Sequence, residues 1–122
     1  MKKLLARMGY ALKGWRSFFT RDDNGRIQLL MAVGVVVAGL YLRVSKGEWL
    51  ALLLCIALVL SLEMVNAAIE KLCDHLHPEQ HPSIGKVKDM AAGAVLWSAA
   101  ISAVIGLVIL LPKFLVKVGL IS

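Results

Sequence analysis

The sequence is poor in charged residues and in the residue types that interrupt or cross-link soluble domains. Of its 122 residues only 18% are charged and only three are proline, whereas soluble proteins average about 25% charged residues. The two cysteines, Cys55 and Cys73, stand 18 positions apart, which is neither a disulfide framework nor a zinc-ligand spacing. These shortages argue against a soluble enzyme, a disulfide-stabilised secreted domain and a closed zinc site.

The usual soluble nucleotide-binding motifs are also absent. Gly9 and Gly14 have the spacing of the glycines in GxxxxGK[ST], but Trp15 and Arg16 follow in place of Lys and Ser or Thr. Neither the HRD nor the DFG motif of protein kinases is present. If the protein handles phosphate groups, we therefore expect that chemistry at a membrane surface.

Apolar residues are abundant instead. Hydrophobic residues make up 59% of the chain and the mean hydropathy is +0.76, values typical of a membrane protein. We expect one all-α membrane domain over residues 1–122, with transmembrane helices over 27–43, 49–70 and 90–111 and a loop over 75–88. The net charge of +6 could indicate nucleic-acid binding, but the apolar content favours a membrane and no nucleic-acid partner.

Residues 1–26 predict a basic amphipathic helix and a turn rather than a membrane span. Apolar side chains recur there at helical spacing: Leu4, Leu5, Met8, Leu12, Trp15 and Phe19. Basic side chains flank or oppose them: Lys2, Lys3, Arg7, Lys13 and Arg16. Such a helix suits the membrane interface. A cleaved signal peptide is the alternative, although its apolar core would begin unusually late.

The distribution of basic residues predicts the orientation. Ten of the 14 Lys and Arg residues precede the first apolar run or lie in or beside the long loop, and four lie in the first connection and the tail. Basic residues accumulate on the cytoplasmic side of membrane proteins. We therefore expect a multi-pass protein with a cytoplasmic N-terminus and a cytoplasmic 75–88 loop.

Glu63 is the most informative residue because it follows a long apolar run in the second predicted span. Counted from Trp49, it lies about 21 Å along the helix, where a carboxylate costs about 2.5–3.5 kcal/mol to insert. Such a group normally faces a protein interior or a wet cavity. The alternative is that the span ends at Leu62 and Glu63 meets water.

The residues after Glu63 favour the first interpretation. Asn66, Glu70 and Asp74 fall at +3, +7 and +11, within about 60° of Glu63 on one helix face. A desolvated carboxylate at Glu63 suits a general base. Glu70, about 10 Å further along the axis, could hold a hydrated Mg²⁺.

Several other polar residues have ordinary explanations when each is taken alone. Lys88 could be a positive-inside anchor, Asp89 could cap the third span and Asp22 could cap the first. Together with Glu70, however, these residues are expected to lie at one level near the cytoplasmic surface of the membrane. Three histidines, His75, His77 and His81, form no recognised zinc set, and contact of this loop with a nucleotide is more plausible.

Two segments resemble the prokaryotic integral-membrane diacylglycerol kinase family, which includes undecaprenol kinases. These are LEMVNAAIEKLCD (62–74) and GKVKDMAAGAVL (85–96). The N-terminal GYALKGWRSFF also resembles the surface helix of the family. The resemblance implies a homotrimer in a bacterial inner membrane that transfers the γ-phosphoryl group of ATP to a lipid hydroxyl with Mg²⁺.

The resemblance also implies roles for individual residues. Glu63 matches the catalytic base, and Asp22 and Glu70 match the metal-binding carboxylates. The implied ATP-binding residues are Lys3, Tyr10, Asp22, Glu70, Glu79, His81, Lys88 and Asp89. The implied lipid-binding residues are Arg16, Arg26, Glu63 and Asn66. Asp22 replaces the usual Glu, so the neighbouring Asp23 is an alternative metal ligand, and Lys3 replaces a common Arg.

The acceptor expected from the resemblance is diacylglycerol, which would yield phosphatidic acid. Undecaprenol, which would yield undecaprenyl phosphate, is the alternative. A small proton-coupled transporter is the non-enzymatic alternative, because one intramembrane carboxylate can bind substrate and proton in turn.

Overall fold

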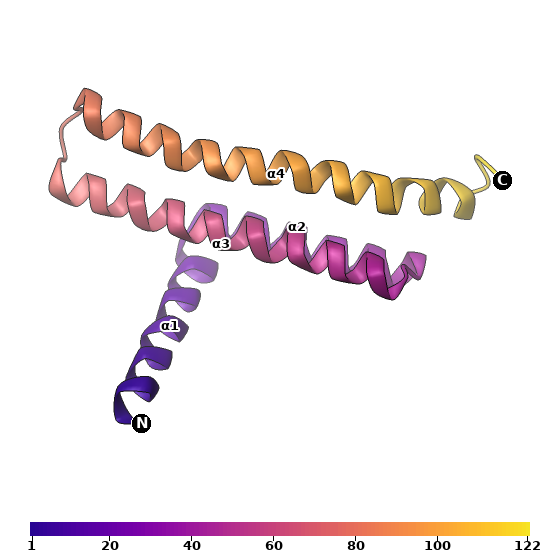
Figure 1. The fold of residues 1–122 in the computed structure, drawn as a ribbon, viewed down its shortest axis with the longest axis horizontal. Helices are drawn as coiled ribbons and strands as arrows, with labels where there is room; N and C mark the ends of the chain where they lie inside the picture. The colour runs from indigo at the N-terminus through magenta and orange to yellow at the C-terminus, as the bar shows by residue number, and fades with distance from the viewer.

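The structure, a computed structural model that describes residues 1–122, consists of four helices joined by short connections. In chain order they are α1 (Lys2–Arg21), α2 (Asp23–Leu42), α3 (Lys46–Leu76) and α4 (Pro82–Lys117). The helices α2, α3 and α4 run alongside one another, and α1 projects steeply from them (Figure 1). Three helices, α2, α3 and α4, are long and apolar enough to cross a membrane. The predicted all-α fold with an N-terminal helix and three spans is thereby confirmed.

The helices extend beyond the apolar runs from which the spans were predicted. The connection between α3 and α4 covers only residues 77–81, inside the predicted 75–88 loop. The connection is short because α4 begins early. The His81 ring accepts a hydrogen bond from the Ser83 N–H, and Pro82 occupies the first helical position. His81 therefore caps α4, and the interpretation of Asp89 as the cap is wrong. Hydropathy marks the part of a helix that suits lipid, whereas caps decide where the helix begins.

The corner between α1 and α2 is tighter than the expected break. Only Asp22 interrupts the helices, and its carboxylate accepts a hydrogen bond from the Gly25 N–H at 3.2 Å. Asp22 therefore caps α2, as its position in the sequence allowed. Gly25 lies against the carbonyl of the buried Phe18, where a Cβ would collide with the backbone. This close approach fixes where Asp22 stands relative to α2.

The connection between α2 and α3 is closed by local interactions. Arg43 ends α2 in the left-handed conformation, with φ of 53°. Ser45 and Glu48 then form a reciprocal capping box at the start of α3. Lys113 of α4 lies 3.1 Å from the Glu48 carboxylate. We call this the opposite end of the bundle, and the end that carries residues 77–81 the loop end.

Little of the single chain is buried. Only 10 of its 122 residues have nearly all of their surface covered by the rest of the chain. The buried apolar side chains are Phe18, Val44, Leu52, Cys73 and Val95, and the buried polar ones are Glu63, Asn66 and Ser98. The apolar stripe of α1 is uncovered, with Leu5 59% and Trp15 53% exposed. Such a surface requires lipid or another chain to cover it.

Candidate active site

Glu63 lies in the interior of α3 and is only 8% exposed. The helix continues thirteen residues beyond it to Leu76, and the low exposure of Glu63 agrees with a carboxylate that faces the protein interior. Gln28 of α2 donates a hydrogen bond from Nε2 to Glu63 Oε1 at 3.3 Å. This contact fixes the carboxylate with a neutral donor and leaves it without a cationic partner.

Asn66 and Glu70 follow on the same face of α3. The Asn66 side chain is 7% exposed, and its Nδ2 donates to Glu70 Oε1 at 3.2 Å. The Asn66 Oδ1 atom is buried and has no hydrogen-bond partner in the chain. A buried polar atom without a partner is costly unless water or a ligand satisfies it. The amide oxygen therefore marks a place where a polar ligand or water fits.

The corner at Asp22 brings a third carboxylate to this face. Asp22 and Glu70 both act electrostatically on Glu63, so carboxylates from the α1–α2 corner and from α3 share one region. The neighbouring Asp23 is exposed and forms an ion pair with Arg26. Between the two candidate metal ligands, Asp22 is thus the one close enough to Glu63 to act on its charge.

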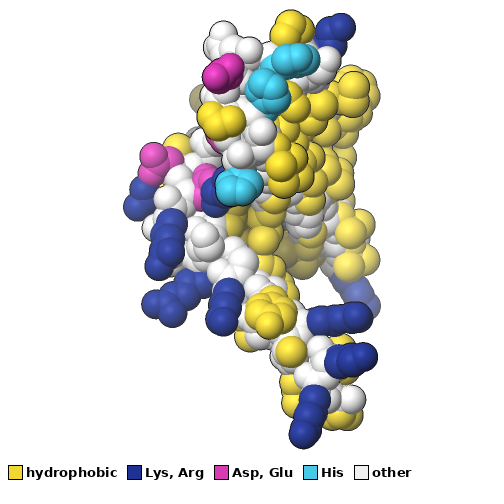
Figure 2. Space-filling view, turned by 90° about the vertical axis from the view of Figure 1, so that its left-hand side faces the viewer, with side chains coloured by type: hydrophobic (Ala, Val, Ile, Leu, Met, Phe, Trp, Pro, Cys, Tyr) yellow, Lys and Arg dark blue, Asp and Glu magenta, His cyan; other side chains and the backbone are white.

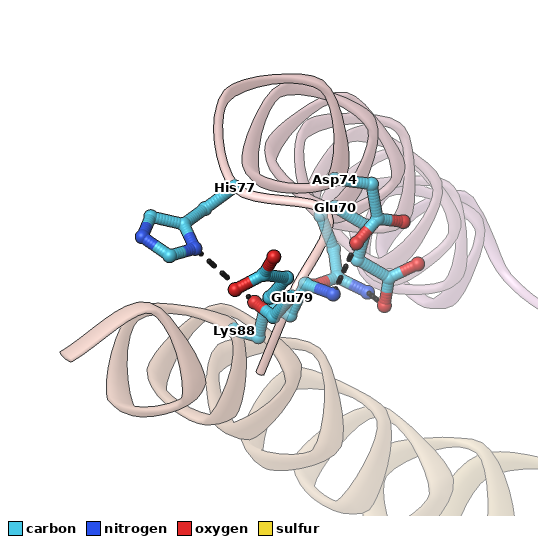
Figure 3. Close-up of polar contacts among 6 residues, drawn as sticks. Glu70, Asp74, His77, Glu79 and Lys88 are labelled. Atoms are coloured by element: carbon cyan, nitrogen blue, oxygen red, sulfur yellow. Dashed lines mark hydrogen bonds and ion pairs between the residues drawn. The ribbon is translucent and has the colours of Figure 1, made fainter. Parts of the chain in front are cut away.

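Asp74 and Lys88 link the loop-end turns of α3 and α4 through a hydrogen-bonded ion pair (Figure 3). Lys88 lies before the apolar part of α4 begins at Met90. The hydrogen bond to Asp74 is the main reason that the pKa of the Lys88 ammonium is raised above its ordinary value. A lysine is cationic at neutral pH at its ordinary pKa, so Lys88 offers a positive charge close to Glu70.

The connecting residues border a cavity of about 490 Å³ at the loop end. Its polar lining includes Asp74, His77, Glu79, His81 and Lys88. His77 contacts the Glu79 backbone oxygen through Nδ1 at 3.2 Å (Figure 3). Figure 2, which views this end, shows acidic and histidine side chains beside a group of cationic ones. A hollow of mixed charge and this size can admit part of a nucleotide.

The remaining residues implied by the resemblance lie outside this group in the single chain. Tyr10 is 69% exposed on α1, and Lys3 stands near the free end of that helix (Figure 1). Arg16 is exposed on α1, Arg26 pairs with Asp23, and Asp89 is exposed on α4. One chain therefore joins Glu63, Asn66, Glu70 and Asp22, but not the residues of α1.

Gln28 is the site residue that the sequence analysis missed. It is the only amide in the otherwise apolar stretch from Ile27 to Leu42, and that isolation was the available signal. Its partner lies 35 positions away on another helix, so helical periodicity could not pair them.

The residues fit a lightly ligated magnesium ion better than a fully enclosed metal. No group of three or more His, Cys, Asp or Glu side chains could hold an ion. Magnesium commonly takes only one or two carboxylates and completes its shell with water and phosphate oxygens. Asp22, Glu70 and the unpartnered Asn66 oxygen offer donors of the required hard-oxygen kind.

Comparison with known proteins identifies the family. A family model described as prokaryotic diacylglycerol kinase matches residues 9–110. The undecaprenol kinase of Bacillus subtilis (strain 168) is 40% identical over 92 residues, which are 75% of each chain. The diacylglycerol kinase of Escherichia coli (strain K12) is 33% identical over 112 residues, which are 92% of each chain. That of Pseudomonas aeruginosa is 32% identical over 94 residues.

These matches, the three apolar helices and the buried carboxylate of Glu63 define a multi-pass membrane protein of the kinase class. The chain belongs to the prokaryotic diacylglycerol kinase family. The family resemblance and the expectation of an enzyme that phosphorylates an alcohol group are confirmed. The transporter alternative therefore falls away.

Proposed function

We propose that the protein is a membrane lipid kinase that transfers the γ-phosphoryl group of ATP to the hydroxyl of a lipid alcohol. The observation that carries this proposal is the buried Glu63, which is held by Gln28 and lies near Asp22 and Glu70 in a chain of a kinase family. A buried carboxylate with no cationic partner is expensive, and catalysis gives a reason to keep it.

Glu63 acts as the general base in this proposal. Its carboxylate takes the proton of the lipid hydroxyl while the hydroxyl oxygen forms a bond to the γ-phosphorus. The bond between that phosphorus and the bridging oxygen breaks, and ADP leaves with the bonding electron pair. Gln28, through its 3.3 Å hydrogen bond, holds Glu63 in position for this transfer.

Asp22 and Glu70 would hold Mg²⁺, and Asn66 orients Glu70 through its 3.2 Å hydrogen bond. When bound, the ion supplies neutralisation of phosphate charge, which is the main requirement of phosphoryl transfer. Lys88 supplies a further positive charge, and Glu79, His81 and Asp89 surround the nucleotide. Lys3 and Tyr10 of α1 complete the nucleotide site, while Arg16 and Arg26 meet the lipid headgroup.

The arrangement of α1 supports a homotrimer whose sites form between neighbouring chains. Within one chain, Lys3 and Tyr10 stand on α1, which projects away from the other three helices (Figure 1). A neighbouring chain could bring such a helix to the site and cover exposed apolar surface. We place the protein in the bacterial inner membrane with the N-terminus and the loop end in the cytoplasm, where ATP is available.

Of the two candidate acceptors, undecaprenol is favoured by the 40% identity to an undecaprenol kinase. Diacylglycerol, the acceptor expected from the resemblance, is supported by several diacylglycerol kinases at 26–34% identity. Both lipids offer a primary hydroxyl at the membrane interface, so the catalytic groups suit either.

A direct competition assay tests this proposal. Purified protein in mixed micelles receives γ-³²P-labelled ATP and Mg²⁺ with equal amounts of both acceptors. Label is expected in lipid for the wild type and the Glu48→Gln control, and not for Glu63→Gln. Glu48 is a suitable control because it serves the opposite end of the bundle. Absence of labelled lipid from the wild type with both acceptors would refute the proposal.

A further inference from the structure

An apolar groove of about 610 Å³ runs between α2, α3 and α4. Fifteen of its 18 lining residues are hydrophobic, so the groove suits a hydrocarbon chain and not a headgroup. Gln28 and Leu60 line it towards the loop end, and Leu42 and Phe114 line it at the opposite end.

The groove is continuous with the candidate active site. Gln28 lines the groove and also donates the hydrogen bond to Glu63. A lipid whose hydroxyl meets Glu63 can therefore lay its tail along α2 without leaving the protein surface. This continuity favours the acceptor itself as the occupant.

Small residues of α4 keep the groove open. Ala99, Ser102, Ala103 and Gly106 line its α4 wall. A Cβ added at Gly106 would have no other atom within 4 Å, so a larger side chain there would enter empty space. Ser102 and Gly106 both face the groove in the single chain.

The length of the groove indicates what kind of chain it takes. From Gln28 to Leu42, α2 rises about 21 Å, whereas one leaflet contributes only about 15 Å of hydrocarbon. A tail that filled the groove would pass the bilayer midplane, so only a tail longer than one leaflet can fill it. We propose that this groove binds the hydrocarbon tail of the acceptor and selects a single long-chain polyprenol, with Gly106 as a specificity-determining residue. This inference rests on the proposed lipid kinase function.

The test compares Gly106→Leu with Gly34→Leu. Gly34 also has open space around it but does not line the groove. The two variants therefore carry the same substitution, one inside the groove and one outside it. In mixed micelles, Gly106→Leu is expected to lower kcat/KM for undecaprenol about tenfold or more. The activity of Gly106→Leu with a short prenol and with diacylglycerol should stay within about twofold of wild type. The activity of Gly34→Leu should stay within about twofold of wild type with every acceptor. Equal effects of the two variants, or no preference of the wild type for longer prenols, would overturn the inference.

A binding measurement separates this inference from the proposed function. Wild-type protein in nanodiscs is irradiated with a long-chain prenol that carries a diazirine at its tail end, and the attached peptides are identified by mass spectrometry. Labelling near Leu111 and Phe114 that is lost in Gly106→Leu supports the groove even if no kinase activity is found. Labelling confined to the outward-facing Leu96 and Trp97, or cross-linked chains showing that a second copy fills the groove, would overturn it.

Discussion

The two ends of the helical bundle use the same residue types for different purposes. At the opposite end, Glu48 is satisfied by the Ser45 backbone and Lys113. In the half of the bundle nearer the loop end, Asp74 is paired with Lys88, but Glu63 is buried with only an amide donor and Glu70 is held by Asn66. The comparison teaches that carboxylates with cationic partners close the fold here, whereas those left with neutral partners mark the candidate site.

The largest expected effect comes from replacing the buried base. Glu63→Gln should lower kcat by about 10²–10⁴-fold, because the amide cannot take the hydroxyl proton. The protein should still fold, since the new side chain keeps an oxygen that can accept from Gln28. Steady-state phosphorylation of lipid measures the loss, and Glu48→Gln should stay within about twofold of wild type. Equal losses in both variants would erase the distinction between the two ends.

Removing a proposed metal ligand should have the next largest effect. Glu70→Gln and Asp22→Asn should each raise the Mg²⁺ concentration for half-maximal activity by about tenfold or more, because a hard cation prefers charged oxygen ligands. Titration of Mg²⁺ at saturating ATP measures this shift. Asp23→Asn is the matched control, since Asp23 is exposed and paired with Arg26. A comparable shift in that variant would transfer the ligand role to Asp23.

Loss of the Gln28 contact should have an intermediate effect. Gln28→Leu should reduce kcat by about tenfold, because a hydrogen bond to a charged group contributes about 1.5–3 kcal/mol. The KM for ATP should not change, since Gln28 does not line the loop-end cavity. Asn24→Leu, which alters an exposed amide of the same helix, serves as control. An unchanged kcat in Gln28→Leu would show that Glu63 does not need this donor.

The smallest effects are expected from the two lysine–carboxylate pairs. Lys113→Met should change the free energy of unfolding by about 1 kcal/mol or less, because partly exposed ion pairs contribute little, and should leave activity intact. Lys88→Met should have an equally small effect on thermal stability but raise the KM for ATP. Thermal denaturation and ATP titration distinguish the two. If Lys113→Met also weakened ATP binding, the opposite end could not be purely structural.

Part of the site was predictable from local spacing. Glu63, Asn66, Glu70 and Asp74 share one face of a helix, which residue intervals alone indicate. The place of Asp22 next to that face came from the family resemblance, and the structure brings it there through a corner that depends on Gly25. Gln28 could not be predicted as a partner of Glu63, because the contact depends on how α2 packs against α3.

The sequence by itself determined a membrane protein of four helices and one face of acidic and amide residues, since composition and periodicity are properties of the chain. Only the tertiary structure decided where α4 begins, which aspartate at the α1–α2 corner acts on the charge of Glu63, and that an apolar groove leads to Gln28. The physical reason is that caps, corners and grooves arise where segments distant in the chain approach one another. That approach follows from packing, which residue spacing within one helix does not specify.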